Sequence, residues 1–528
     1  MRFLLVNPFY PVSECPSPPL GLSFLAAALE RADIETKILD LVVTPYSRDR
    51  LQKVIEDFSP DIIGSTAVTM TYDFAAGLIR DVKALAPEIK TVMGGPHVTF
   101  CAAETMALLP ELDFIVMGEG EEAIVQLTRA VERGRGFEEI EGLAFRRDGR
   151  VAITGVRTPG LDVNDLAPPA RHLVPLGRYR AMNLAIGMTT SRGCPFNCIF
   201  CVGRKMVGAK VRYRDPLKVV DELEYLGSLG FPQVNIADDL FTANKKHCFG
   251  VCDEILRRGL KIKWTSFARV DTVVPEVMVR MKEAGCTAVS FGVETGNPQI
   301  MKTIKKGITL EQVEKAVKMC ADAGILPHAS FILGLPGETP ATVEETVAFG
   351  EKIKSYGTAY GFHLLAPFPG TEIRDKAEEY GIRVLTNDWT QYHANRAIVE
   401  TPEAPAALLD AVAGKWEKEF QDYLVLIKEK MKLGTATEEE AWPLVNLERT
   451  VLIYDLMMDE FMEKKASWPA AETPGDEQAL DRLISLAAEH AGKDRTIAEG
   501  AFKNAFEKNN IRRRDENGRL RWEWVDYL

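Results

Sequence analysis

The stretch that decides the fold of this chain reads Ser191-Arg192-Gly193-Cys194-Pro195-Phe196-Asn197-Cys198-Ile199-Phe200-Cys201. Its three cysteines have the spacing C-x3-C-x2-C. Three thiolates can hold a four-iron cluster and leave one iron without a protein ligand, whereas ordinary electron-transfer clusters use four cysteines. An iron with an open position can bind a substrate. The spacing therefore favours a catalytic cluster over a purely electron-carrying one.

Two other uses of clustered cysteines fit this stretch less well. A structural zinc ion usually takes four ligands with paired C-x2-C spacing, but no histidine or fourth cysteine lies near, and the next cysteine is Cys248. A disulfide cannot use three thiols evenly, and disulfides are rare in cytosolic chains. We therefore expect the three cysteines to bind a metal cluster.

The other residues of the stretch resemble the radical S-adenosylmethionine (SAM) superfamily, through Arg-Gly before the first cysteine, Pro-Phe-Asn between the first two and Phe200 before the last. In that superfamily the open iron of a [4Fe-4S] cluster chelates the amino and carboxylate groups of SAM. Electron transfer then cleaves SAM to methionine and a 5′-deoxyadenosyl radical. The resemblance implies that Cys194, Cys198 and Cys201 are both the metal ligands and the catalytic residues.

Length and composition indicate an ordinary multidomain protein. The chain has 528 residues, of which 46% are hydrophobic and 27% charged, and this length predicts two to four domains. The formal net charge of −12 offers no overall basic field for nucleic acid. Nine cysteines in 528 residues do not form a secreted disulfide framework.

The sequence also predicts a location. The apolar run at residues 1–8 is too short for a signal peptide, and no run of about 18 apolar residues predicts a membrane span. We therefore expect the protein in the cytoplasm, which also suits an oxygen-sensitive cluster.

Strand and helix patterns alternate over residues 184–385. Six such units fit a partial (β/α)6 TIM barrel, the architecture of the radical SAM core, and active residues in such barrels lie at the C-terminal ends of the strands. The three cysteines follow the first strand, as this rule requires. The expected strands are Leu184–Thr189, Gln233–Ala237, Lys263–Phe267, Ala288–Val293, His328–Leu333 and Tyr360–Leu365, and the expected helices lie near 216–229, 244–258, 275–284, 309–323 and 340–355.

The later strand ends carry residues that suit SAM. Its ammonium and ribose suit acidic side chains, its carboxylate suits Arg or Lys, and its adenine suits an apolar wall. The resemblance implies that SAM is contacted by Phe200, Asp238, Asp239, Arg269, Glu294, Gly334 and Leu335.

Within this set each residue has an implied role. Asp238 or Asp239 recognises the amino group, Glu294 lies near the ribose or amino end, and Arg269 is a candidate for the carboxylate. Phe200, Gly334 and Leu335 adjoin the adenine. The alternative is that Asp238-Asp239 caps the following helix and that Arg269 forms a structural pair with Asp271.

A first domain, residues 1–140, precedes the barrel and also alternates strands with helices. Such alternation predicts a parallel sheet with helices on both faces, and ligands bind at the carboxyl ends of its strands. Glycine at those ends lets a flat ligand approach the backbone. The expected strands are Phe3–Val6, Ile34–Leu39, Ile62–Ser65, Thr91–Met93 and Phe114–Met117, and the expected helices lie near 20–31, 48–58, 72–85, 102–109 and 121–133.

The loops of this domain resemble the Rossmann-like cobalamin-binding domain of class B radical SAM enzymes. Classical cobalamin domains carry Asp-x-His-x-x-Gly after the first strand, but residues 7–15 contain no histidine, so we expect no cobalt ligand from this loop. His97 contacts the corrin edge or simply caps its Gly-Gly-Pro turn. The resemblance implies cobalamin contacts from Pro8, Phe9, Pro19, Leu20, Gly64, Ser65, Thr66, Gly94, Gly95, Pro96, His97, Gly118, Glu119 and Gly120.

Two further segments complete the expected organisation. Residues 141–183 contain a hairpin, Leu143–Arg147 and Val151–Thr154, around an Asp-Gly turn, followed by a proline-containing linker. Residues 386–528 form a mainly helical C-terminal domain, with helices over 405–432, 437–466, 476–491 and 495–508 and a terminal hairpin near an Asn-Gly turn. From its position alone, we expect this domain to cap the open barrel and to carry substrate specificity.

The leading functional hypothesis is a cobalamin-dependent radical SAM enzyme that methylates an unactivated carbon of a small-molecule or biosynthetic-intermediate substrate. A radical cyclase or ring-rearranging enzyme, resembling the anaerobic magnesium-protoporphyrin ester cyclase, remains the alternative. A methylthiotransferase is disfavoured, because only Cys15 and Cys101 precede residue 194. A non-catalytic cobalamin or cluster sensor would bind the cofactors without cleaving SAM. The chemistry also implies an electron donor such as flavodoxin or ferredoxin.

Overall fold

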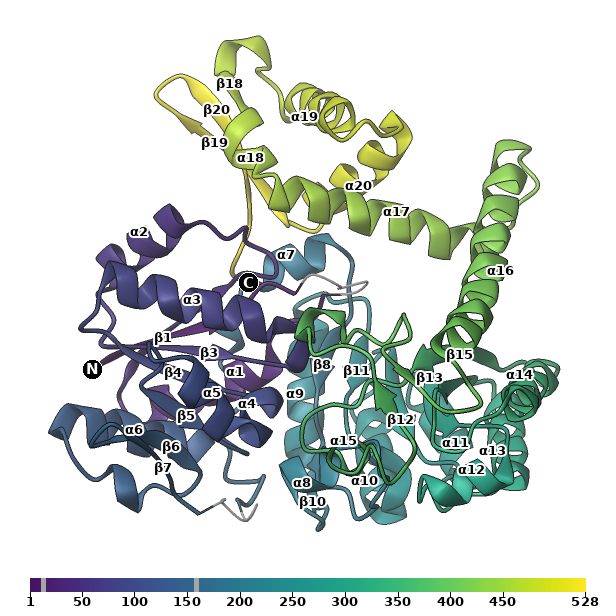
Figure 1. Cartoon of the computed structure of the whole chain (residues 1–528). Helices are drawn as coiled ribbons and strands as arrows, with labels where there is room; N and C mark the ends of the chain where they lie inside the picture. Colours follow the sequence, from purple (N-terminus) through teal and green to yellow (C-terminus); the bar gives the residue numbers. More distant parts are fainter. Residues whose placement is uncertain (11–15, 156–160) are drawn as a thin grey trace.

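The computed structural model describes residues 1–10, 16–155 and 161–528. It contains two α/β domains side by side and a third, C-terminal domain (Figure 1). The loop for which no cobalt-binding histidine is expected falls in part, at residues 11–15, outside the described residues.

The first domain is built on a seven-stranded sheet of order β2-β1-β3-β4-β5-β6-β7. The first five strands run parallel, and β6 and β7 are antiparallel. The hairpin expected in the linker thus extends the first sheet instead, because β6 pairs with β5. The strands are β1 (Arg2–Asn7), β2 (Glu35–Asp40), β3 (Ile62–Thr66), β4 (Lys90–Gly94), β5 (Phe114–Val116), β6 (Leu143–Arg147) and β7 (Arg150–Ile153).

Helices cover both faces of this sheet, because its central strands are apolar on both sides. Along β1, Phe3 and Leu5 pack on the face of α1 and α6, whereas Leu4 and Val6 pack on the face of α2 and α3. The helices are α1 (Leu20–Arg31), α2 (Arg48–Phe58), α3 (Tyr72–Leu85), α4 (Pro96–Phe100), α5 (Ala102–Leu108) and α6 (Glu121–Arg133).

The second domain is an open, six-stranded parallel sheet of order β15-β14-β13-β12-β11-β8. This agrees with the predicted partial barrel, strand by strand. Its strands are β8 (Ile186–Met188), β11 (Val234–Ile236), β12 (Trp264–Ala268), β13 (Cys286–Glu294), β14 (Leu326–Leu333) and β15 (Ala359–Leu364), and its main helices are α9 (Pro216–Ser228), α10 (Lys245–Arg257), α11 (Pro275–Glu283), α13 (Leu310–Asp322) and α14 (Pro340–Lys354).

Short elements complete the two α/β domains. Helix α7 (Leu176–Ala181) leads into the barrel, and α8 (Gly203–Val207) follows the three cysteines. The remaining elements are β9 (Ser191–Arg192), β10 (Arg212–Tyr213), α12 (Pro298–Thr303), α15 (Glu372–Asp375), β16 (Arg383–Val384) and β17 (Val399–Glu400).

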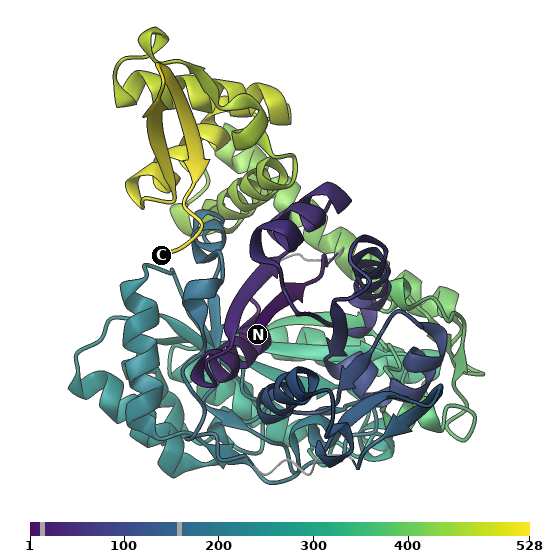
Figure 2. The same cartoon turned by 90° about the vertical axis from the view of Figure 1, so that its left-hand side faces the viewer.

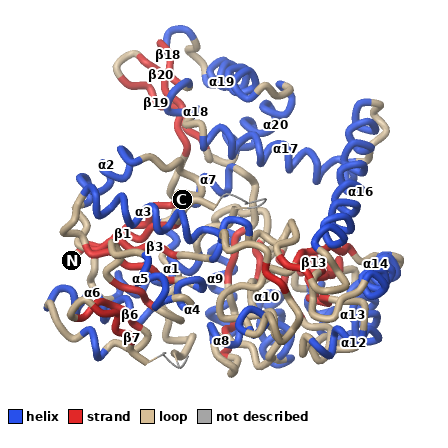
Figure 3. Tube along the Cα trace, in the orientation of Figure 1, coloured by secondary structure: helices blue, strands red, loops and turns tan. Residues whose placement is uncertain are grey.

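The C-terminal domain combines helices with a small antiparallel sheet of order β18-β20-β19, seen as red strands beside blue helices in Figure 3. The expected helices and terminal hairpin are therefore present. The elements are α16 (Ala406–Lys432), α17 (Glu438–Met458), α18 (Phe461–Lys465), β18 (Ser467–Pro469), α19 (Asp476–Ala491), α20 (Arg495–Glu507), β19 (Ile511–Glu516) and β20 (Arg519–Trp524).

Only the first part of this segment covers the carboxyl ends of the barrel strands: Val399 of β17 and Leu409 of α16 pack against the ends of β14 and β15. From α17 onward it projects away from the α/β domains (Figure 2). It docks on α7, before the first barrel strand, where Arg180 donates to Asn510 Oδ1 (2.5 Å) and Thr450 donates to the carbonyl of Met182 (2.7 Å). Residues 366–385 also cover the strand ends, because the sequence after β15 folds back over them.

None of the helices that the structure describes is both long enough and apolar enough to cross a membrane.

Candidate functional site

The three-cysteine loop (residues 193–201) lies between β9 and α8, beyond the C-terminal end of β8. Cys194 donates its N–H to the carbonyl of Gly208 (3.0 Å), and the N–H of Gly203 donates to Cys201 Sγ (3.3 Å). All three thiols are free. In the described ranges no three His, Cys, Asp or Glu side chains are placed to hold a single metal ion.

Asp238 fixes the segment that leads into this loop. The residue is 2% exposed, and its carboxylate accepts the N–H of Thr190 (2.6 Å), the Thr190 hydroxyl and the Ser191 hydroxyl (2.7 Å). The Thr190 hydroxyl also contacts Nε2 of His247 (2.9 Å), and burial lowers the pKa of His247 to about 4. These contacts occupy the Asp238 carboxylate within the protein, so its evident role is to position the loop.

Asp239 has the opposite orientation. Its side chain is exposed and lines the large cavity described below, together with Ala237 and Ser191. The alternative that this Asp-Asp pair caps the next helix does not hold, because α10 is capped by Asn244, which accepts the N–H of His247. Of the two acidic candidates, Asp239 alone faces a space that a ligand can enter.

Arg269 supports the three-cysteine loop by packing against Phe196. Its guanidinium lies 3.5 Å from the centroid of the Phe196 ring, pairs with Asp271 through two contacts of 3.0 Å, and donates to the carbonyl of Lys306 (2.9 Å). The structural pair considered from the sequence is therefore present. With these partners Arg269 is buried, and it holds Phe196 in place.

Glu294 sits at the end of β13 in a left-handed conformation, with φ of 74°. Such a backbone is costly for a residue other than glycine and often marks a functional site. The side chain is buried and pairs with Nζ of Lys306 (2.6 Å), whose ammonium lies 5.8 Å from the Phe200 ring. Burial raises the pKa of the Cys198 thiol, and the charges of Lys306 and Arg269 oppose that rise.

Glu338 holds the end of β14. Its Oε2 accepts the N–H of Gly334 (2.6 Å), a residue with φ of 95°, and burial raises the pKa of Glu338 to about 7. Leu335 is fully buried and packs in one hydrophobic cluster with Ile199 and Phe200 of the three-cysteine loop. Glu338 thus positions Gly334 and Leu335 against the loop, a role that sequence reasoning did not assign.

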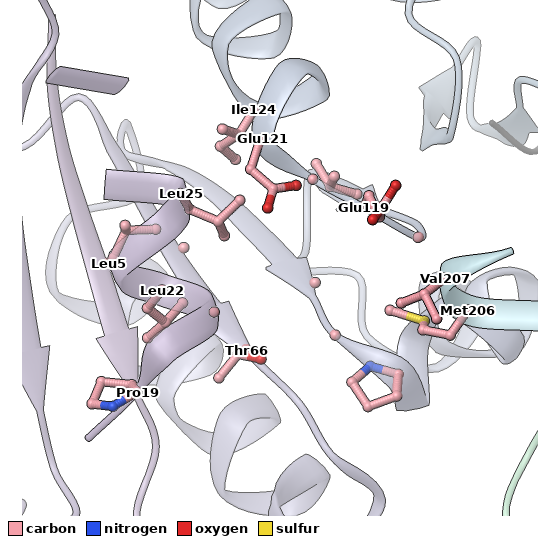
Figure 4. Close-up of a pocket in the computed structure, with 18 of the residues that line it drawn as sticks. Leu5, Pro19, Leu22, Leu25, Thr66, Glu119, Glu121, Ile124, Met206 and Val207 are labelled. Atoms are coloured by element: carbon pink, nitrogen blue, oxygen red, sulfur yellow. The ribbon is translucent and has the colours of Figure 1, made fainter. Parts of the chain in front are cut away.

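A cavity of about 520 Å³, here called the interdomain cavity, lies between the two α/β domains. One wall is formed by the strand ends of the first sheet and by α1. The other is formed by Thr189, Ser191, Arg192, Ala237 and Asp239 of the barrel and by Met206 and Val207 of α8. Figure 4 shows Met206 and Val207 across the cavity from Pro19 and Leu22. The cavity therefore connects the first domain with the surroundings of the three-cysteine loop.

Most residues predicted to contact cobalamin line this cavity. Glycine is required at Gly95, where φ is 103° and a side chain would come within 2.7 Å of the Ala67 carbonyl. At Gly118 nothing lies within 4 Å of the position of a side chain, so the wall stays open there. The predicted residues in the lining are Pro19, Gly64, Ser65, Thr66, Gly94, Gly95, Pro96, Gly118, Glu119 and Gly120.

The other four predicted residues lie elsewhere. Pro8 lines a smaller neighbouring cavity of about 260 Å³, and Phe9 and Leu20 line neither cavity. His97 is 2% exposed and packs against the Tyr72 and Trp389 rings, with Nδ1 3.3 Å from the Thr69 hydroxyl. Burial lowers the pKa of His97 to about 4, so this histidine is neutral. Among the described residues, no histidine lines either cavity.

Glu119 joins the two α/β domains by ion pairs. Its carboxylate accepts two contacts from Arg212 (2.8 and 2.9 Å) and one from Arg192 (3.2 Å), and Glu121 pairs with Arg192 at 2.7 Å. The side chains of these four residues are at most 15% exposed. Because Arg192 stands two residues before Cys194, the network links the first domain directly to the three-cysteine loop.

Sequence reasoning missed the segment after the last barrel strand. Ile373 donates its N–H to the carbonyl of Ile199 in the three-cysteine loop (3.0 Å). The Arg374 guanidinium lies 4.8 Å from the Trp389 ring, and Trp389 in turn packs on His97 of the first domain. The aromatic residues of this segment were an available signal, but its irregular backbone gives no periodicity from which its position could be read.

Two family models match the chain, the Radical SAM superfamily over residues 188–350 and the B12 binding domain over residues 12–128. An uncharacterized methyltransferase from Pyrococcus horikoshii is 36% identical over 400 residues, which cover 74% of this chain and 86% of that protein. The anaerobic magnesium-protoporphyrin IX monomethyl ester cyclase of Rubrivivax gelatinosus is 30% identical over 445 residues, or 80% of this chain and 78% of that one.

A solved structure resembles the whole molecule. The cobalamin-dependent S-adenosylmethionine radical enzyme OxsB, with aqua-cobalamin and S-adenosylmethionine bound, matches with a TM-score of 0.70 at 18% identity. The match covers 96% of this chain and 78% of OxsB. At this identity the likeness shows a shared fold, and it extends over the C-terminal domain.

Proposed function

The chain belongs to the cobalamin-binding radical SAM family, and on that premise we propose that it methylates an unactivated carbon of a small-molecule substrate. The interdomain cavity carries the proposal. It is lined on one side by the glycine-rich strand ends of the first sheet and on the other by Asp239 and Ser191, next to the three-cysteine loop. A methyl carrier and a radical source can therefore serve a single substrate there.

The residues around the cavity fit the family's cofactors. When bound, a [4Fe-4S] cluster supplies the electron that cleaves SAM, and cobalamin supplies the methyl group. We assign the cluster to the three free thiols. The N–H of Gly203 donates to Cys201 Sγ and can stabilise a thiolate there. We assign cobalamin to the wall of Gly64, Gly94, Gly95 and Gly118, because a flat macrocycle needs backbone that carries no side chains in its way.

For SAM we assign Asp239 to the ammonium group. An exposed carboxylate beside the loop can form a charge-assisted hydrogen bond with it, whereas the Asp238 carboxylate is occupied by Thr190 and Ser191. Phe200 forms the wall for the adenine, and the fully buried Leu335 supports it from the same apolar cluster. For Glu294 the ribose or amino end of SAM stays a prediction, because its buried carboxylate pairs with Lys306, and Arg269 acts through Phe196.

The proposal includes two broader points. A reducing compartment protects an oxygen-sensitive cluster, so we place the protein in the cytoplasm. Radical cyclisation is the second candidate function, favoured by the relative named as a cyclase. The methyltransferase relative has the higher identity, 36% against 30%, and the match covers a larger share of that protein, 86% against 78%. Methylation is therefore placed first.

Product analysis tests the proposal. Protein reconstituted anaerobically with iron, sulfide and cobalamin is incubated with dithionite and SAM, and products are separated by chromatography. A methyltransferase forms both 5′-deoxyadenosine and S-adenosylhomocysteine, because one SAM gives the radical and another gives the methyl group. A cyclase forms 5′-deoxyadenosine alone, and a sensor forms neither. The Cys198→Ala variant should lack the cluster and form no 5′-deoxyadenosine; formation at the normal rate would refute the cluster assignment.

A further inference from the structure

Helix α8, directly after the last cysteine, has two different faces. Met206 and Val207 line the interdomain cavity, whereas Arg204 and Lys205 are exposed. The helix lies at the outer edge of the barrel domain (Figure 1). Cys201, two residues before α8, is itself exposed. A partner that approaches the outer face of α8 therefore comes close to the three-cysteine loop.

Exposed cations gather around this point. We define the basic face as Arg204, Lys205, Lys210 and Lys305, all of them exposed. Backbone contacts place the last of these beside the loop: Ile199 donates its N–H to the carbonyl of Ile304 (3.2 Å), and Ile373 donates to the carbonyl of Ile199 (3.0 Å). Lys205 donates to the carbonyl of Gly370 (2.6 Å), which joins α8 to the same region.

Carboxylates neutralise only part of the basic face. Lys305 pairs with Glu372 (2.7 Å) and Lys205 with Asp375 (3.5 Å), so one side of α15 supplies both anions. Arg204 donates to the carbonyl of Pro195 (2.7 Å), a neutral partner. Among the described residues Lys210 has no carboxylate within ion-pair distance. Two of the four cations, Arg204 and Lys210, thus have no carboxylate partner among the described residues, in a chain whose formal net charge is −12.

From this juxtaposition we propose that the basic face docks a small acidic one-electron carrier protein. The inference rests on the proposed function, in which each SAM cleaved takes up one electron. The donor is oxidised by one electron, the C5′–S bond of SAM breaks, and methionine and the 5′-deoxyadenosyl radical form. Complementary charge steers a partner to a surface and raises its association rate by about 10-fold to 1,000-fold. A donor docked beside the three-cysteine loop also lies close to the cluster, which shortens the path of the electron.

The test separates the donor's docking from the chemistry. The variant Lys205→Glu/Lys210→Glu reverses two charges and leaves Arg204 in place, because Arg204 bonds to Pro195 within the loop. The variant removes the exposed ion pair of Lys205 with Asp375, which contributes little to stability, and the exposed hydrogen bond from Lys205 to the Gly370 carbonyl. The matched control is Lys415→Glu/Lys418→Glu, an equal charge change at exposed positions of α16.

Rates of 5′-deoxyadenosine formation are measured with reduced flavodoxin and, separately, with dithionite. We expect the Lys205/Lys210 variant to lose about 10-fold or more of the flavodoxin-driven rate at low ionic strength, and less at about 0.15 M salt, where charges are screened beyond about 8 Å. The dithionite-driven rate and the iron content should be unchanged, and the control variant should behave as wild type.

Two results would overturn the docking proposal. One is a flavodoxin-driven rate equal to wild type, which would mean that the donor approaches elsewhere. The other is an equal loss with both reductants, which would mean that these lysines act on the cluster or on an anionic substrate. Absence of 5′-deoxyadenosine from the wild type with dithionite would refute the proposed function itself.

Discussion

Asp238 and Asp239 show how adjacent residues with one chemistry take different roles. The first is buried and bound to Thr190 and Ser191, and the second is exposed to the interdomain cavity. Successive side chains at a strand end point in opposite directions. The sequence therefore predicts that one of the two aspartates contacts the ligand. Which aspartate does so depends on the side of the barrel against which the first domain packs.

Separate substitutions of the two aspartates should have different effects. Asp239→Asn should raise the Kd for SAM about 10-fold or more, because the amide weakens a charge-assisted hydrogen bond worth roughly 1.5–3 kcal/mol. Its iron content should remain normal. Asp238→Asn should lower the iron content and the thermal stability, because an amide cannot accept all three hydrogen bonds. Equilibrium binding of SAM and iron analysis measure both effects; the reverse pattern would exchange the two assignments.

His97 makes stability depend on pH. Its folded-state pKa of about 4 lies below the usual value of about 6.5, so the unfolded state binds the proton more tightly. Its contribution is fully present above pH 6.5 and is lost as the pH falls toward 4, by about 1.4 kcal/mol per pH unit.

The variant His97→Gln checks this contribution. Between pH 7 and pH 5 the unfolding free energy of wild type should fall by roughly 2 kcal/mol more than that of the variant. Denaturant unfolding at the two pH values measures the difference, and comparison of the two proteins cancels the titration of buried acids such as Asp40 and Glu338. Equal pH dependence would mean that His97 is protonated freely in the folded state. Because His97 lies outside the cavity lining, the variant should also keep the visible spectrum of bound cobalamin.

At the scale of elements, strand–helix alternation predicted nearly all of the two α/β domains. Periodicity identifies a strand and its faces, and short loops fix which strands are neighbours. The same pattern does not reveal long-range pairings, so the hairpin of β6 and β7 was assigned to a linker although it joins β5. It also does not reveal contacts between domains, such as those of Glu119 in the loop before α6.

The variant Glu119→Gln tests the link between α6 and the three-cysteine loop. It leaves Arg212 without a carboxylate partner, and breaking a buried pair costs roughly 3–5 kcal/mol. We expect a lower Tm and weaker retention of cobalamin. Glu132→Gln is the control, since Glu132 belongs to the exposed end of α6 and pairs with Arg129 only on the surface, where a pair is worth about 0–1 kcal/mol. Equal effects of the two variants would exclude a special role for the Glu119 network.

At the scale of the whole molecule, the C-terminal domain docks on α7, the helix that leads into the barrel. Arg180 of α7 donates to Asn510 Oδ1, to the carbonyl of Lys508 and to the carbonyl of Leu229. It thus ties the C-terminal domain to the barrel on the side away from the three-cysteine loop. Position in the sequence gave no information on this, because a domain at the end of a chain can fold back on any surface.

The variant Arg180→Ala separates stability from catalysis. Loss of the four hydrogen bonds that the Arg180 guanidinium donates should lower the unfolding free energy by a few kcal/mol, seen as a lower Tm by calorimetry. The Kd for SAM should stay the same, because α7 is remote from Asp239 and the loop. A large increase in that Kd would instead support the original expectation that the C-terminal domain shapes the active site.

The central claim is that one interdomain cavity brings cobalamin and the cluster together. Electron paramagnetic resonance of protein that holds both Co(II) cobalamin and the cluster tests it most directly, because two unpaired spins interact when they are close. We predict that reduction of the cluster broadens the Co(II) signal and speeds its relaxation, and that Cys198→Ala protein with cobalamin bound shows neither change. A Co(II) signal that is identical with the cluster reduced and oxidised would contradict the claim.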